Sequence, residues 1–311
     1  MHIQIPPVVH AALMLPETLL AINLSGGKDG QAMLKALRVL ISPFWQATIV
    51  ILHMNLGRME WRHTLSHCWH LALQAGLPFI VLRKKRYENG YVQYVDLIDD
   101  ILARKDKLEA EGRDIPFWPS AGIRYCTKSQ KSNVSDKYYR HWKYVISAEG
   151  IRADESTKRA EKKPLHIRKS ITAEYLKQMP VETAFCHRQG DQRWGVNWYP
   201  IFDWSLDDVW QVCGTSCEDL ERRRALYNAG KQQEAFDGWL AHRAYVYGAD
   251  RVSCALCVLA NKATLEAGAR HNPELLDTLC QMEIDGGYTF KKNYSLTEFY
   301  QDKCHLELLG L

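Results

Sequence analysis

The chain has 311 residues, which is enough to bury a full hydrophobic core in one large domain or in one domain with a smaller appendage. Its 46% hydrophobic and 24% charged residues are ordinary for a globular protein, and the net charge of +4 permits an anionic substrate or nucleic acid without requiring one. No stretch is apolar and long enough to span a bilayer, and the first residues lack the pattern of a secretory signal. We therefore expect a cytoplasmic protein that does not enter the membrane.

The first half of the chain alternates between apolar strands and amphipathic helices. We expect four strands, over residues 18–25, 46–55, 77–83 and 142–152. We expect two helices between them, over residues 29–41 and 61–76, the second of which ends at Gly76. This order is typical of an α/β fold with a doubly wound, mainly parallel twisted sheet.

The second half has a different pattern. Residues 151–169 are rich in charge, and we interpret them as a loop that can act as a lid. From about residue 205 the pattern becomes mainly helical. We therefore expect an α/β domain over residues 1–204 and a mainly helical C-terminal region over residues 205–311 that packs on it.

A glycine-rich turn, LSGGKDG (residues 24–30), joins the first expected strand to the first expected helix. Open α/β sheets bind ligands at such turns, and the amides of Gly26 and Gly27 with the helix N-terminus favour phosphate oxygens. Lys28 can neutralise a phosphate, and Asp29 can hold magnesium or orient the start of the helix. The alternative is a tight turn with no ligand. The spacing matches neither the Walker loop nor the dinucleotide fingerprint.

The turn resembles the PP-loop of the ATP pyrophosphatase superfamily, usually written SGGxDS. Five further blocks follow in order and are similar to those of the phosphoadenosine phosphosulfate (PAPS) reductase-like branch of that superfamily: HMNLGRMEWRHTLSH, FWPSAGIRYCTKSQK, GIRADESTKRA, YPIFDWSLDDVW and HRAYVYGADRVSCALC. That branch includes sulfonucleotide reductases and the sulfur-inserting enzyme of DNA phosphorothioation. The resemblance implies an adenine nucleotide alpha hydrolase-like fold, with a PP-loop nucleotide-binding domain over residues 1–204.

The resemblance also implies a nucleotide site. A loop that keeps its lysine favours ATP, cleaved between the α and β phosphates with Mg²⁺, whereas PAPS is the alternative nucleotide. The residues that the resemblance assigns to nucleotide binding are Ser25, Gly26, Gly27, Lys28, Asp29, Gly30, Asn55, Gly150, Arg152 and Arg159. Those that it assigns to catalysis are Lys28, Asp29 and Arg152.

Three positions depart from the family pattern. Gly30 replaces the final serine of the loop, Asn55 stands where aspartate is usual, and Arg62 stands where proline is usual. Loss of a hydroxyl and a carboxylate near the phosphates would weaken metal-assisted chemistry. A non-catalytic protein that binds nucleotide or nucleic acid within a larger complex is therefore one alternative.

The cysteines indicate a second kind of site. Cys254 and Cys257 have the CxxC spacing of a metal site or a redox pair. By resemblance to relatives that carry a four-iron cluster, these two and Cys126 are the expected ligands of an iron–sulfur (4Fe-4S) cluster. Cys280 is the expected fourth ligand, with Cys186 or an open iron as alternatives. Zinc is the competing metal. The remaining alternative is that the two cysteines bind no metal and only pack in the protein interior.

These features together predict an enzyme that transfers sulfur at the expense of ATP. ATP would be cleaved to AMP and pyrophosphate to activate an acceptor, which is then thiolated through the cysteine-bound cluster. The alternative enzyme is a PAPS reductase, although the C-terminal Cys304–His305 pair lacks the ECGxH context of those reductases. The expected partners are an adenine nucleotide and either a nucleic-acid acceptor or a sulfur-donor protein. The acceptor (DNA, tRNA or a metabolite) and the oligomeric state stay open.

Overall fold

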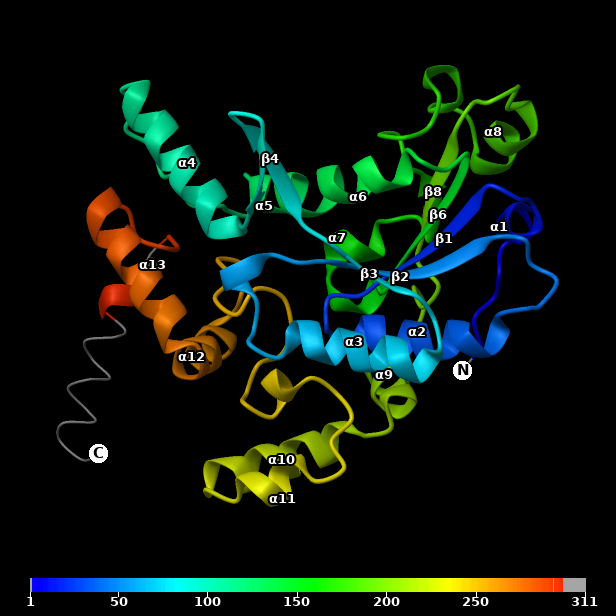
Figure 1. The fold of residues 1–311 in the computed structure, drawn as a ribbon. Coiled ribbons are helices and arrows are strands. Elements are labelled where there is room, and N and C mark those ends of the chain that lie inside the picture. Colours follow the sequence, from blue (N-terminus) through cyan, green and yellow to red (C-terminus); the bar gives the residue numbers. More distant parts are fainter. Residues whose placement is uncertain (1, 293, 299–311) are drawn as a thin grey trace.

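A six-stranded, mainly parallel sheet forms the centre of the computed structural model, which describes residues 2–292 and 294–298 (Figure 1). Its strand order is β3-β2-β1-β6-β8-β7, and β7 alone runs antiparallel to its neighbour β8 among the described strands of this sheet. The strands are β1 (Thr18–Asn23), β2 (Thr48–Met54), β3 (Phe79–Leu82), β6 (Tyr144–Glu149), β7 (Leu165–Ile167) and β8 (Trp194–Trp198). A separate antiparallel hairpin consists of β4 (Lys84–Glu88) and β5 (Tyr91–Val95).

Both faces of the sheet are buried, as expected for parallel strands that are covered by helices. Leu20 and Ile22 of β1 belong to a core shared with α2 (Lys28–Leu40), α3 (Thr64–Ala75) and α9 (Leu206–Cys213). Leu19 and Ala21 point to the opposite face, where Tyr139 of α6 (Asn133–Tyr139) packs against them. Successive strand residues alternate between faces, so an uninterrupted apolar run is needed to fill both layers.

The strand order places a crevice at one edge of the sheet. The chain runs from β1 outward to β2 and β3, and then returns to the other side of β1 to form β6. The loops that leave β1 and β6 therefore diverge in opposite directions. Open α/β sheets bind their ligands at such a switch point, at the carboxyl ends of the strands.

The other described helices surround this frame. They are α1 (Pro7–Leu13), α4 (Leu97–Ala110), α5 (Tyr125–Thr127), α7 (Thr157–Ala160), α8 (Val181–His187), α10 (Cys217–Asn228), α11 (Gln232–Phe236), α12 (Lys262–His271) and α13 (Pro273–Gly286). Short helical turns are η1 (Gly57–Met59), η2 (Lys128–Ser132), η3 (Ala153–Glu155), η4 (Glu174–Leu176) and η5 (Arg243–Tyr245). Among the described helices, none has the length and apolar character needed to cross a membrane.

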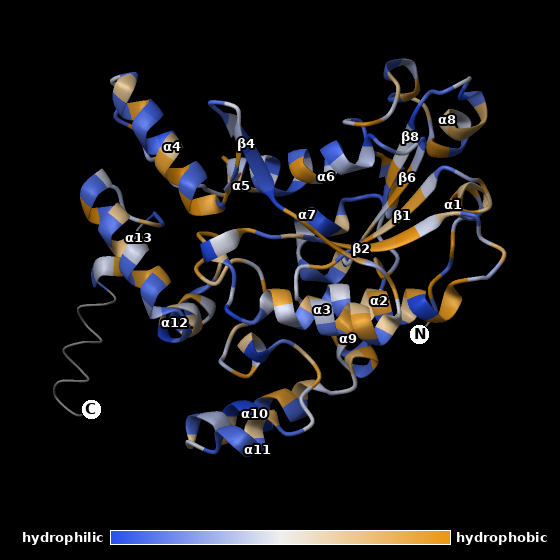
Figure 2. Cartoon of the chain, in the orientation of Figure 1, coloured by the Kyte–Doolittle hydropathy of each residue, from blue (hydrophilic) through white to orange (hydrophobic). Residues whose placement is uncertain are grey.

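The α/β fold class, with a mainly parallel sheet and a helical C-terminal part, is confirmed. α12 and α13 lie beyond the edge of the sheet where β2 leads into η1 (Figure 1). One buried core contains residues from both parts, including Leu34 and Leu276. Apolar residues concentrate in the central strands and the inner helix faces, while polar residues face outward (Figure 2). The boundary at residue 204 stays a prediction, because the core continues across it.

Residues 151–169, which we expected to be a loop, are largely structured. They form η3, the single turn α7 and the edge strand β7, which pairs with β8 through Leu165, His166 and Ile167. β7 consists of only Leu165, His166 and Ile167, and it lies within a segment that is otherwise rich in charged residues. The pattern therefore concealed a strand.

Candidate functional site

The glycine turn forms the start of α2. Gly26 has φ +81°, a left-handed conformation that favours glycine, and Gly27 caps the helix without a side-chain hydrogen bond. The Lys28 backbone N–H donates to the Tyr245 hydroxyl over 2.8 Å. The amides of Asp29 and Gly30 follow in the first turn, where helix N–H groups have no intrahelical acceptor. The positive end of the helix dipole therefore lies at this turn.

A cavity of about 280 Å³ opens at the switch point of the sheet. It is lined by Asn23 from the end of β1, Gly150 after β6, and three chemically distinct groups. These are the turn residues Ser25, Gly27, Asp29 and Gly30, the cations Lys131, Arg159 and Arg251, and the thiols Cys126, Cys254 and Cys257. The fold thus brings the glycine turn and the three predicted thiols together, although about 100 residues separate the turn from Cys126 and more than 200 separate it from Cys254 and Cys257.

Asp29 is the centre of an ion-pair network under the turn. Its Oδ1 accepts from Arg152 Nε over 2.6 Å, and its Oδ2 lies 3.3 Å from Lys28 Nζ. Both cationic side chains are buried, Arg152 with only 3% of its surface exposed. Lys28 Nζ packs 5.4 Å from the centre of the Tyr245 ring. Lys28 and Arg152 therefore reach the cavity through Asp29 and do not line it themselves.

The Gly-Ile-Arg loop after β6 is pressed against the start of α2. A Cβ on Gly150 would lie 2.7 Å from the Asp29 carbonyl carbon and 2.8 Å from the Gly30 nitrogen, so only glycine fits there. Arg152 Nη1 donates to Asp154 Oδ2 and to the Trp204 carbonyl. These contacts tie the blocks GIR and FDW of the sequence to the glycine turn.

Two departures from the family pattern have different surroundings. Gly30 lines the cavity, and a Cβ there would lie 3.3 Å from a methyl group of Leu24, so a serine would need a small shift of that side chain. Asn55 does not line the cavity. Its Oδ1 accepts from the Gly57 N–H over 2.9 Å and so closes the turn that begins η1.

The cavity carries excess positive charge. Its acidic groups are already paired, Asp29 as above and Glu155 with Arg159. Within the part of the chain that the structure describes, Lys131 and Arg251 have no carboxylate partner within 4 Å. Burial lowers the pKa of Arg159, and the charges of Arg251 and Arg152 lower it further. An anion in this cavity would relieve that repulsion, which favours a polyphosphate or sulfate group.

Cys126 lies in the single helical turn α5, whereas Cys254 and Cys257 lie together in one loop. Cys254 pairs with Glu60 through a backbone bridge, and the Ala255 N–H donates to the Met59 carbonyl, so the CxxC turn is fixed beside η1. The Cys254 thiol donates a hydrogen bond to Cys257, which lowers the pKa of Cys257, and the nearby Arg251 charge acts in the same direction. Arg251 Nη2 lies 3.8 Å from the Cys257 sulfur. Burial raises the pKa of Cys126, and the charge of Cys257 contributes to that rise.

The donor set fits a thiophilic metal centre. Cys126, Cys254 and Cys257 also line a second, apolar cavity of about 30 Å³, so they separate the polar cavity from apolar side chains. Thiolates with a water-excluding wall are the usual surroundings of iron–sulfur clusters. Over residues 2–292 and 294–298, no three cysteine, histidine or carboxylate side chains are arranged closely enough to coordinate one metal ion. The side chains would have to converge on binding.

Cys280, the predicted fourth ligand, is not brought to either cavity. It is buried on α13, and burial, with the neighbouring Glu283 charge, raises the pKa of its thiol to about 11. Cys186, the alternative, is exposed on α8. Cys304 and His305 lie outside the described residues.

A family model decides the relationship of this chain to known proteins. The model describes the phosphoadenosine phosphosulfate reductase domain, and it matches residues 19–260. The chain belongs to this family. The matched range contains the glycine turn, Gly150, Arg152 and the three cavity cysteines, whereas Cys280 lies beyond it. No curated protein matches the chain by sequence.

Solved structures give distant similarities to this PAPS reductase family member. FMN adenylyltransferase from Candida glabrata, in complex with FAD and inorganic pyrophosphate, is 12% identical with a TM-score of 0.31, covering 64% of this chain and 49% of that chain. The same enzyme with FMN and the ATP analogue AMPCPP is also 12% identical with a TM-score of 0.31, and the match covers 65% of this chain and 49% of that chain. The U34-tRNA thiolase NcsA from Methanococcus maripaludis, with its [4Fe-4S] cluster, is 14% identical with a TM-score of 0.37. This match covers 75% of this chain and 76% of that chain. This chain thus spans about half of the adenylyltransferase, and TM-scores below 0.5 support no conclusion.

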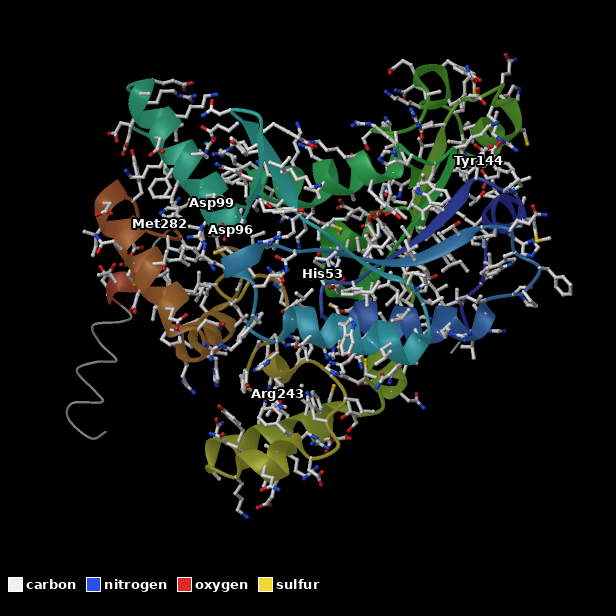
Figure 3. All side chains as sticks on the ribbon, in the orientation of Figure 1. His53, Asp96, Asp99, Tyr144, Arg243 and Met282 are labelled. Carbon is white, nitrogen blue, oxygen red and sulfur yellow. The ribbon has the colours of Figure 1, made fainter. Side chains whose placement is uncertain are left out.

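Several residues that shape the site of this family member were not assigned a role from the sequence. The Tyr245 hydroxyl accepts a hydrogen bond from the Lys28 backbone N–H. The Glu60 carboxylate lies 3.2 Å from Nε2 of His53 and so holds that ring in place. His53 lies between the sheet and α3, with its Nδ1 3.0 Å from the Leu24 carbonyl (Figure 3). Tyr245 and Glu60 stand inside blocks that the resemblance marked. The role of Tyr245 was not visible because its partner Lys28 is 217 positions away, whereas the contact of Glu60 with His53 depends on how the chain turns after β2.

A buried histidine cluster under the turn makes stability depend on pH. The His242 Nδ1 accepts from the Ala244 N–H, so Nε2 carries the proton and faces the Thr64 hydroxyl at 3.2 Å. Burial, together with the charges of His67, His63 and Arg243, lowers the pKa of His242 to about 3. Burial, together with the charge of His70, lowers the pKa of His67 to about 4. The unfolded chain binds protons below pH ~6.5, which the folded chain does not.

We therefore expect the free energy of unfolding to fall as the pH drops from about 6.5 to about 4. The loss is about 1–2 kcal/mol per histidine at pH ~5. Urea denaturation of wild type and His242→Asn at pH ~7 and pH ~5 measures it. The variant should lose about 1–2 kcal/mol less than wild type on acidification. An equal loss in both proteins would show that His242 is not a buried neutral group.

Proposed function

We propose that the protein binds ATP in the polar cavity and uses it to transfer sulfur. The observation that carries this proposal is one cavity lined by a helix-capping glycine turn, three cations and three thiols. ATP would be cleaved between its α and β phosphates when an oxygen of the acceptor attacks the α phosphorus and pyrophosphate leaves. A sulfur nucleophile would then attack the activated carbon or phosphorus, and AMP would leave with the acceptor oxygen.

The described residues divide into two roles in this proposal. The Asp29 and Gly30 backbone N–H groups would donate hydrogen bonds to phosphate oxygens, and the α2 dipole would favour the negative charge there. Lys131, Arg159 and Arg251 supply positive charge, which stabilises the charge that develops on the phosphates. Lys28 and Arg152 are positioning residues, because they hold the Asp29 carboxylate. This assigns Lys28 and Arg152 an indirect part in catalysis.

Magnesium does not fit the described carboxylates well. Asp29 and Glu155 are the acidic residues that line the cavity, and both are bonded to cations. A protein-held Mg²⁺ would need an oxygen ligand that is not already paired. We therefore assign no step to a protein-bound magnesium ion.

Cys126, Cys254 and Cys257 fit an iron–sulfur cluster as its ligands, and such a cluster would supply a thiophilic iron. The thiols must lose their protons to bind iron, and Arg251 favours the charged form of Cys257. Zinc remains the competing metal, because thiolates also bind it.

The expected result of anaerobic reconstitution with iron and sulfide is bound iron in wild type and at least a tenfold loss of it in Cys254→Ala. Cys217→Ala serves as the matched control, because Cys217 lies on α10 away from both cavities. Iron and acid-labile sulfide analysis gives the readout. Zinc binding with no iron would support the competing metal, and equal iron in all three proteins would contradict the ligand assignment.

The reaction itself is tested with labelled nucleotides. Reconstituted wild type is given ATP labelled in the α phosphate and sulfide as the sulfur source, with bulk transfer RNA or DNA as acceptors in separate reactions. Equal amounts of AMP and pyrophosphate support the proposal, whereas ADP and phosphate contradict it. No turnover in either reaction supports the non-catalytic alternative that Gly30 and Asn55 suggest.

A PAPS reductase is the second candidate, because the matching family model describes that domain. Its cavity would hold the sulfonucleotide on the same three cations. Release of sulfite from PAPS, with no AMP formed from ATP, would favour it over the first proposal.

A further inference from the structure

The β4–β5 hairpin stands out from the molecule and was not expected from the sequence. Asn89 and Gly90 join its strands, with φ values of +51° and +81°. An Asn-Gly pair with positive φ at both residues is the preferred two-residue hairpin turn. β4 lies between α4 and α6 and is among the most hydrophilic strands in view (Figures 1 and 2).

One face of the hairpin combines cations with exposed aromatic rings. Lys85 pairs with Tyr94, and Tyr87 pairs with Val92, so these four side chains share a face. Tyr87 is 72% exposed and Tyr94 is 54% exposed. The Tyr94 ring also lies 5.2 Å from the Arg83 guanidinium and 5.6 Å from Lys85 Nζ.

A groove of about 420 Å³ lies between this hairpin and α6. Arg83, Lys85 and Tyr87 line one side, and Lys137 and His141 line the other. No aspartate or glutamate lines it among the residues that the structure describes. In the same described part of the chain, neither Arg83, Lys85 nor Lys137 has a carboxylate within 4 Å, so their charges are available to a ligand.

The groove leads toward the candidate site. Ser129 of η2 lines the groove, and Lys131 of the same turn lines the polar cavity next to Cys126. Lys84 Nζ fixes this turn to the hairpin, because it donates to Ser129 over 2.7 Å. A chain-like ligand in the groove can therefore extend over η2 into the cavity.

We propose that this groove binds a single strand of nucleic acid and that the strand is the acceptor of the sulfur transfer proposed above. Lysine and arginine bind backbone phosphates, and exposed tyrosines stack on unpaired bases without regard to sequence. An acidic peptide would use the cations but would leave Tyr87 and Tyr94 without stacking partners. The binding part of the proposal stands on the hairpin alone, and the acceptor part rests on the proposed function.

Fluorescence anisotropy with a labelled mixed-sequence DNA oligonucleotide tests the binding. The same sequence as RNA and as a DNA duplex completes the comparison. We expect wild type to bind a single strand more tightly than the duplex, with an affinity that falls as salt rises. Lys85→Glu and Tyr87→Ala, which change two residues that line the groove, should each weaken binding on the order of tenfold.

The opposite face of the hairpin provides matched controls. Arg86 and Tyr91 lie on that face, and Tyr91 is 75% exposed. Arg86→Glu and Tyr91→Ala therefore remove a cation and an exposed tyrosine from the face opposite to the proposed binding face. Both control variants should bind like wild type. Equal loss in the control and test variants, tighter binding of the duplex, or no binding of any oligonucleotide would overturn the inference.

The acceptor role has a separate readout. AMP release from ATP should increase when the single strand is added to wild type and should stay at its basal level with Lys85→Glu. Binding without any ATP turnover would leave the groove intact and count against the proposed function. ATP turnover that ignores the bound strand would overturn the acceptor role alone.

Discussion

Gly150→Ala is expected to lower the free energy of unfolding by about 3 kcal/mol and to weaken binding of an ATP analogue more than tenfold. The added Cβ would lie 2.7 Å from the Asp29 carbonyl carbon and 2.8 Å from both the Asp29 oxygen and the Gly30 nitrogen. These atoms belong to the backbone, so no flexible side chain can move aside. The loop after β6 must shift away from the glycine turn, and this deforms the start of α2.

A second Gly-Ile-Arg tripeptide in the chain gives the matched control. Gly122 precedes Ile123 and Arg124, and a Cβ on Gly122 would meet nothing within 4 Å. Gly122→Ala should therefore change stability by less than about 0.5 kcal/mol. Urea denaturation and calorimetric titration with a non-cleavable ATP analogue measure both effects. If the two variants behave alike, close packing of the two loops is not what shapes the turn.

Asp29→Asn should lower the free energy of unfolding by about 3 kcal/mol, since breaking a buried ion pair leaves an uncompensated charge. Arg152 is 3% exposed and would keep only the more exposed Asp154 as an acidic partner. Lys28 would lose its carboxylate partner as well. The asparagine keeps the shape of the side chain, so the effect reports the loss of charge.

Asp154→Asn is the control for this ion pair because it removes the other carboxylate bound to the same guanidinium. The Asp154 side chain is 58% exposed, and exposed ion pairs contribute about 0–1 kcal/mol. A double-mutant cycle of Asp29→Asn with Arg152→Ala should show a coupling energy above about 1 kcal/mol. A coupling near zero would contradict the positioning role that we assign to Arg152.

Features that depend on neighbouring residues could be predicted from the sequence. The strands at residues 18–25 and 46–55 are continuous apolar runs, and β1 and β2 occupy these segments. Gly76 ends α3 in a left-handed conformation, as the glycine at that position indicated. The Asn89-Gly90 turn carried an equally local signal, which was not used, and the hairpin was therefore missed.

Features that depend on distant partners could not be predicted. A lysine in a phosphate-binding turn is expected to face the ligand, but Lys28 turns toward Asp29 and the Tyr245 ring, 217 positions further along the chain. Arg152 was assigned to phosphate, and only the tertiary structure shows that Asp29 and the Trp204 carbonyl occupy it. Lys131 and Arg251 lie in two of the sequence blocks without a signal that relates them, and only the tertiary structure brings both to the same cavity.

Protection of cysteines from alkylation by a bound nucleotide tests most directly whether the turn and the thiols form one site. The full chain, without metal, is treated with iodoacetamide with and without an ATP analogue that has a methylene group between the α and β phosphorus atoms. Mass spectrometry follows Cys126 and Cys257 in the cavity and Cys186, which is exposed on α8, as the internal reference. We expect the analogue to slow alkylation of Cys126 and Cys257 several-fold and to leave the rate at Cys186 unchanged. Unchanged rates at both cavity cysteines, at analogue concentrations that saturate the protein, would contradict it.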